Sequence, residues 1–181
     1  HPLITVGLID PLRNRWGAVP ARFAKQRFQH PSVDLDRVEP SVVDWIRARL
    51  VPKVLVASQT KVIEAIVDEV GCAVPSVPVV SVEPRPEAPS LWHVAALLTS
   101  PVATTLAVLD AAGTAMSADA IRVSAARLAR LPLPPDRGAW DEAAAAARRG
   151  DIDECGWAML RAHGLSHRCD VFEFWRSRCP S

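Results

Sequence analysis

The sequence predicts an α+β fold, in which a small mixed sheet with flanking helices is followed by a helical C-terminal tail. Two observations predict it. Short β-branched and aliphatic runs fill the first half of the chain, and apolar residues recur at helical spacing from residue 90 onward. With 181 residues, 49% of them apolar, the chain can bury one core and carry an appendage. We therefore expect an α+β domain at residues 1–135 and a helical extension at residues 136–181.

The first half alternates apolar runs with breakers. Strands are expected at residues 3–9, 53–57, 62–67 and 77–82, and a loop is expected at residues 12–20. Pro40 suits the first turn of a helix over residues 41–50, because its apolar residues fall on one face. The segment EPRPEAP at residues 83–89 contains three prolines and is a linker by composition.

Helical signals dominate the second half. One helix is expected at residues 90–98, and another, capped by Ser100 with Pro101 at its first position, is expected at residues 101–112. A short strand at residues 120–123 and a helix at residues 124–131 follow. Asp151 and Glu154 match the spacing of a capping pair. The last helices are expected at residues 139–149, 151–163 and 170–178.

Charge is distributed unevenly on a chain whose net charge is only +1. Residues 1–61 hold ten Lys or Arg against five Asp or Glu, whereas residues 62–121 hold one against seven. A basic block at one end of a nearly neutral chain indicates a polyanion partner, although a solvated basic face explains the charge equally well.

Catalytic motifs are missing. The sequence has no GxGxxG, no glycine-rich P-loop and no GxSxG, and its serines and histidines favour no particular triad. The best metal candidate is a group of four residues, Cys155, His163, His167 and Cys169, with a His-x3-His spacing that zinc sites use. Its first cysteine lies within a helical pattern and Gly164 separates the histidines, so we expect no metal site. We also expect no catalytic residue in this chain.

Candidate DNA contacts remain in the N-terminal third. Arginine and lysine side chains there can bind phosphates, Trp16 can stack on a base, and Ser, Gln and Thr side chains can bond to base edges. Each residue also has a simpler explanation as a core or solvated side chain. The candidates are Arg13, Arg15, Trp16, Arg22, Lys25, Arg27, Lys53, Ser58, Gln59, Thr60 and Lys61.

Four short segments, in order, resemble a known family. They are Lys53-Val54-Leu55, the apolar run at residues 79–82, LLTSP at residues 97–101 and LPLP at residues 131–134. Their order resembles the TaqI-like target-recognition domain that follows the catalytic domain in DNA methyltransferases of restriction-modification systems. The resemblance covers residues 3–135, and its order is more specific than any single motif.

The resemblance implies sequence-specific binding of double-stranded DNA on behalf of a covalently linked, S-adenosylmethionine-dependent methyltransferase domain. That domain would hold the cofactor and the flipped base. Its Pro-Pro-aromatic motif is absent here, since the chain has no Tyr and its one Pro-Pro is followed by Asp136. The chain opens on His1 with an apolar run close behind, so we expect a piece of a longer protein.

Two alternatives stay open. The chain can be a protein-interaction or oligomerisation module without a nucleic-acid role, because aromatic residues, which are enriched at interfaces, gather in the tail. These are Trp140, Trp157, Phe172, Phe174 and Trp175. A small stand-alone enzyme has the least support. No signal peptide or membrane-length apolar run is present, so a cytoplasmic location without membrane contact is expected.

Overall fold

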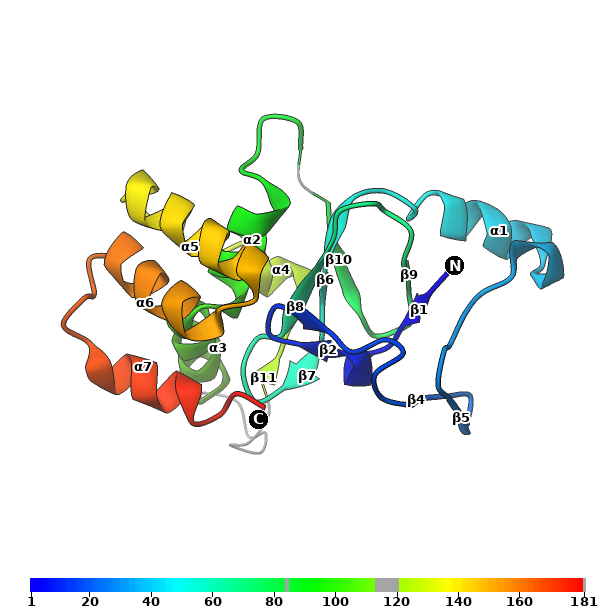
Figure 1. The fold of residues 1–181 in the computed structure, drawn as a ribbon, viewed down its shortest axis with the longest axis horizontal. Helices are drawn as coiled ribbons and strands as arrows, with labels where there is room; N and C mark the ends of the chain where they lie inside the picture. Colours follow the sequence, from blue (N-terminus) through cyan, green and yellow to red (C-terminus); the bar gives the residue numbers. More distant parts are fainter. Residues whose placement is uncertain (84, 113–120, 181) are drawn as a thin grey trace.

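The computed structural model describes residues 1–83, 85–112 and 121–180. A central antiparallel sheet separates two unlike halves (Figure 1). Helices cover one side of the sheet, and the N-terminal β-segments with one helix lie on the other. The α+β fold class predicted from the sequence is confirmed.

The central sheet has the strand order β10-β6-β8, formed by β6 (Lys53–Val56), β8 (Ala65–Asp68) and β10 (Val80–Val82). All four residues of β6 are buried, as expected for an uninterrupted β-branched run at the centre of a sheet. The strand expected at residues 62–67 begins only at Ala65. The reason is local, because the amide of Ile63 donates to the Thr104 hydroxyl, at 3.2 Å, instead of to a neighbouring strand.

The N-terminal run is broken into shorter pieces than the sequence predicts. The parallel strands β1 (Leu3–Ile4) and β9 (Val74–Pro75) pair first, and a 3-10 turn, η1 (Val6–Leu8), follows β1. Next, β2 (Ile9–Asp10) pairs with β3 (Arg13–Asn14), which lies inside the segment expected to be a loop. Most apolar residues of this run are buried. The apolar pattern therefore indicated burial correctly, but it did not indicate a single extended strand.

A second hairpin and a helix complete this half. Strands β4 (Ala21–Phe23) and β5 (Gln26–Phe28) form a two-stranded ribbon, which extends away from the central sheet (Figure 1). The short turn η2 (Leu35–Arg37) leads to α1 (Pro40–Arg47), which begins at the expected proline and ends before residue 50. Ile46 of α1 packs on Leu3 and Val74.

The helical half begins after the central sheet. Helix α2 (Leu91–Thr99) is capped by Ser90, and α3 (Pro101–Ala112) begins at Pro101, where the Ser100 hydroxyl accepts from the Ala103 amide. Strand β11 (Ile121–Arg122) pairs with β7 (Gln59–Thr60), and α4 (Ala125–Leu128) follows. The first residue of the strand expected at 120–123 lies outside the described residues.

The C-terminal helices α5 (Arg137–Arg149), α6 (Ile152–Ala162) and α7 (Cys169–Arg176) pack directly on α2 and α3. Trp140 and Met159 share one buried cluster with Ala96 and Leu97 of α2. The predicted extension at residues 136–181 therefore shares its core with the preceding helices. In the described ranges no single helix is long and apolar enough to span a membrane. Helices α2 and α3 together have that length and apolarity, but they are bent by 51° relative to each other.

Candidate nucleic-acid interface

The β4–β5 ribbon carries the densest group of the predicted DNA contacts. Its turn residues, Ala24 and Lys25, have φ angles of 48° and 67°. Positive φ at both turn positions is typical of the tight hairpin turn whose twist matches the flanking strands. Neither residue is the glycine or asparagine that normally marks this turn, so the hairpin had no recognisable signal in the sequence.

Two arginines of the ribbon face each other. In its register Arg22 is directly opposite Arg27, and both side chains are exposed. Like charges at directly opposed positions repel and destabilise an antiparallel pair. Lys25 adds a third positive charge at the turn. Repulsion among these charges destabilises the ribbon, and an anion bound between the side chains would offset it.

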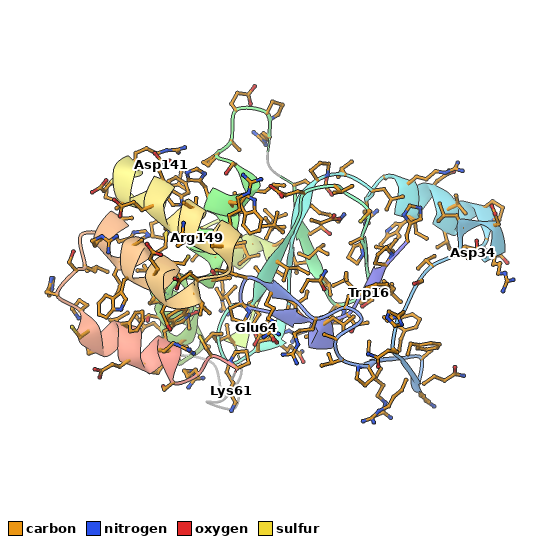
Figure 2. All side chains as sticks on the ribbon, viewed as in Figure 1. Trp16, Asp34, Lys61, Glu64, Asp141 and Arg149 are labelled. Carbon is orange, nitrogen blue, oxygen red and sulfur yellow. The ribbon has the colours of Figure 1, made fainter. Side chains whose placement is uncertain are left out.

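The charges of the ribbon differ from those of the helical half in having no carboxylate partner. Among the described residues no Asp or Glu forms an ion pair with Arg22, Lys25 or Arg27. Most helical arginines are paired, for example Arg149 with Glu154 at 2.6 Å. Figure 2 shows Arg149 on the helical half, well away from the ribbon.

The other face of the ribbon is aromatic. Side chains alternate along a strand, so Phe23 and Phe28 lie on the face opposite Arg22 and Arg27. Their exposed fractions are 44% and 38%, high for phenylalanine. They line an open hollow of about 440 Å³. The remaining lining residues are Leu3, Pro31, Ser32, Val33, Asp34, Arg37 and Val38.

Three other N-terminal candidates occupy different environments. Arg13 is exposed on β3, whereas Arg15 donates to the Asp10 carboxylate at 2.6 Å. The Trp16 indole N–H donates to the Pro31 carbonyl at 2.8 Å, and its ring packs on the N-terminal core. The prediction that Trp16 stacks on a base is therefore not supported, because contacts within the chain already hold the ring.

The bend at residues 58–61 lies apart from the ribbon. The Lys61 carbonyl accepts a hydrogen bond from Arg178 near the C-terminal end, at 3.0 Å, and Figure 2 shows Lys61 well away from Trp16. Gln59 and Lys61 are exposed, and Thr60 donates its hydroxyl proton to the Val62 carbonyl. Ser58 is only 7% exposed, so its hydroxyl is not accessible to a base edge in this structure.

Lys53, which was predicted to contact DNA, lies in the protein core. Its side chain is fully buried, with the ammonium 2.6 Å from the Asp68 carboxylate and 3.1 Å from the Val51 carbonyl. Lys53 and Asp68 are directly opposed in the β6–β8 pair. Burial alone raises the pKa of Asp68, but hydrogen bonds from Lys53 and from backbone amides outweigh it and hold the pKa below its ordinary value. Lys53 therefore stabilises the core and cannot reach a phosphate.

A carboxyl group beside the Arg15–Asp10 pair is strongly perturbed. Burial and, secondarily, the negative charge of Asp10 raise the pKa of Glu64 to about 7. Figure 2 places Glu64 at the lower edge of the central sheet, near Lys61. It is not among the predicted site residues, since an isolated Glu between apolar residues gives no sequence signal.

The structure also connects a Ser, a His and an Asp that sequence spacing did not single out. Ser90 Oγ lies 2.7 Å from His93 Nδ1, and His93 Nε2 lies 2.7 Å from Asp141 Oδ1. Ser90 is the cap of α2, and Arg137 shares the Asp141 carboxylate at 3.2 Å. Ser90, His93 and Asp141 do not line the hollow beside the β4–β5 ribbon. The arrangement caps α2 and ties it to α5.

The remaining sequence candidates are dispersed. Among the described residues no three His, Cys, Asp or Glu side chains gather to hold a metal ion. Most tail aromatics contribute to packing: Trp140 and Trp175 are buried, and Trp157 stacks on Phe172 with ring centroids 4.1 Å apart. Phe174 is 38% exposed. Comparison with family models, curated proteins and solved structures gives no significant match to this chain.

Proposed function

We propose that this chain is the sequence-specific DNA-binding portion of an S-adenosylmethionine-dependent DNA methyltransferase, and that the β4–β5 ribbon is its principal contact with double-stranded DNA. The observation that carries the proposal is the directly opposed pair of Arg22 and Arg27, without a carboxylate partner among the described residues. Negatively charged phosphates bound to these side chains offset the repulsion between them. Binding also releases counterions from the duplex, which favours the complex.

The shape of the ribbon suits the partner. A two-stranded ribbon fits the major groove of B-DNA, and several DNA-binding proteins read the groove in this way. The exposed guanidinium groups of Arg22 and Arg27 have the fork geometry that suits a phosphate or the O6 and N7 acceptors of guanine. Gln59 and Lys61 lie on another part of the surface and are not needed for this contact.

The methyltransferase assignment rests on the ordered resemblance, and the places of its motifs in the fold are consistent with it. The KVL segment lies in the central strand β6, and the run at residues 79–82 overlaps its neighbour β10. LLTSP forms the corner between α2 and α3, and LPLP follows α4. In this proposal the linked catalytic domain supplies the cofactor site and the chemistry.

The test is the salt dependence of duplex binding. Three ribbon cations in contact with phosphates predict a slope of log K against log salt of about −2.7 for the ribbon, at −0.9 per contact. Replacing both arginines (Arg22→Ala with Arg27→Ala) should make the slope less steep by about 1.8. The measurement is fluorescence anisotropy of a labelled duplex between about 50 and 200 mM salt.

A charge-matched control separates the ribbon from overall charge. Arg148→Ala with Arg149→Ala removes the same charge from α5, where both arginines are paired with carboxylates. This variant should keep the original slope. Absence of duplex binding at low salt, or equal slopes in the ribbon variant and the unaltered chain, would refute the proposal.

A further inference from the structure

The hollow beside the ribbon combines two features that seldom occur together on a protein surface. Its wall is apolar and includes the exposed rings of Phe23 and Phe28. The same ribbon carries the cations Arg22, Lys25 and Arg27 on its other face and at its turn, and none of them pairs with a carboxylate among residues 1–83, 85–112 and 121–180. Exposed apolar side chains often mark a binding site, and here they lie on a ribbon that also carries clustered cations, which points to a ligand with both an aromatic and an anionic part.

The dimensions of the hollow suit one planar ring. Its volume of about 440 Å³ is within the range of small-ligand sites, and it is open on one side. Phe23 and Phe28 are diagonal neighbours across the two strands, at the spacing that long or aromatic side chains bridge. A planar base can therefore stack against either phenyl ring without entering the protein core.

The charged groups at the rim of the hollow, Asp34 and Arg37, neutralise each other and leave the rim accessible to an anionic ligand. Asp34, the acid in the lining, accepts from the Asp36 amide and pairs with Arg37 at 3.3 Å. That ion pair is widely exposed, with 85% of the Arg37 side chain accessible, and such pairs contribute little stability. Arg37 neutralises the acid of the lining, so the pair presents no net negative charge to a phosphate.

We infer that the hollow receives one unstacked nucleobase of the bound DNA. The base stacks on Phe23 and Phe28, while the flanking phosphates lie along Lys25 and the arginines of the ribbon. A ribbon of two strands about 5 Å apart is narrow enough for long arginine side chains to reach around its edge. Aromatic stacking beside a basic track is the means by which proteins bind unpaired bases.

The charges favour a nucleic acid over a protein segment or a second copy of this chain. An apolar hollow alone would also accept an aromatic side chain. The cations on the other face and at the turn of the same ribbon favour a partner that carries negative charge close to its ring, and every nucleotide does so. This inference rests on the proposed function, because it assigns a base site to the same DNA-binding ribbon.

The test uses the full chain and three labelled duplexes of one sequence: fully paired, with a one-nucleotide bulge, and with a bulge that lacks its base. Stacking of one base predicts that the base-containing bulge binds about 5- to 150-fold more tightly than the abasic bulge. Phe23→Ala and Phe28→Ala should each reduce this preference severalfold, and Phe28→Leu should do so while keeping apolar bulk. These substitutions remove no charge, so the salt slope for the paired duplex should stay unchanged.

Phe174→Ala is the matched control, since Phe174 is as exposed as Phe28 but lies on α7. It should keep the full preference for the base. Equal affinity for the two bulges, or preference retained in the Phe23 and Phe28 variants, would overturn the inference while leaving salt-dependent duplex binding intact. Absence of all DNA binding would overturn both proposals. A lower mass of the Phe23 variant in light scattering would instead assign the hollow to a second copy of this chain and overturn the base site.

Discussion

Replacing Lys53 by Met separates the two roles that can be assigned to this lysine, a DNA contact or a core ion pair. The substitution leaves the Asp68 carboxylate buried without its cation. Breaking a buried pair by removing one partner costs about 3–5 kcal/mol. Asp68 keeps hydrogen bonds from the amides of Gly71, Cys72 and Ala73, so we expect the lower end, about 3 kcal/mol. Asp68→Asn should cost more, because the buried ammonium then keeps only the Val51 carbonyl among its present partners.

The assay is urea unfolding followed by circular dichroism. With a slope of about 2 kcal/mol per molar urea, Lys53→Met should lower the midpoint by roughly 1.5 M. Combining Lys53→Met with Asp68→Asn should cost less than the sum of the two single changes, by more than about 1 kcal/mol, because the residues are in contact. A loss below about 1 kcal/mol with weakened duplex binding would refute the structural role and restore Lys53 as a DNA contact.

The pH dependence of this pair has a defined sign. The pKa of Asp68 is lowered in the folded chain, so the pair contributes fully above the unfolded pKa near 3.8 and is lost as the pH falls through the lower folded value. The stability difference between the unaltered chain and Lys53→Met should therefore be constant near neutral pH and narrow below about pH 4. A difference that persists unchanged at pH 2.5 would contradict the assignment.

Three further outcomes follow from other sites. Gly156→Ala should cost about 1–3 kcal/mol in the same unfolding assay, because the added methyl group would lie 2.7 Å from the Trp175 ring. Glu64→Gln should stabilise the fold at pH 8 and have little effect at pH 4, because the raised pKa of Glu64, about 7, makes its ionised form unfavourable in the folded state as the pH rises through 4.5 to 7. A thiol reagent should label the exposed Cys72 and Cys169 in the native chain and label Cys155 only after unfolding, because burial raises the pKa of Cys155 to about 12.

The helices were predictable because their signals are local. Ser100 and Asp151 mark helix starts by accepting hydrogen bonds from amides three positions away, and Pro101 marks one by its fixed φ; the structure has a helix at each place. In the N-terminal half, part of the strand pairing depends on residues that are distant in the sequence. The β1–β9 pair joins Leu3 to Val74, and no short-range pattern specifies such a partner. Strand pairing at long separation is therefore the part of the fold that the sequence left undetermined.

The candidate site was predictable in residue type but not in arrangement. Arg22, Lys25 and Arg27 were identified from charge, and the ribbon that groups them became visible only in the structure because its turn lacks glycine and asparagine. The same charge criterion failed for Lys53, whose neutralising partner Asp68 is fifteen positions away. Charge counts along a chain cannot distinguish the two cases, since both depend on which residue lies across the strand.

Cross-strand register gives the criterion that composition lacks. Lys53 and Asp68 are directly opposed, unlike in charge and buried, so their interaction is complete within the fold. Arg22 and Arg27 are directly opposed, like in charge and exposed, and no carboxylate in the described part of the chain neutralises them. The same geometric relation thus stabilises one strand pair and destabilises the other. A basic residue in an antiparallel pair is a stronger candidate for a polyanion contact when its opposed residue is also basic, and on this criterion the β4–β5 ribbon is the first surface to test.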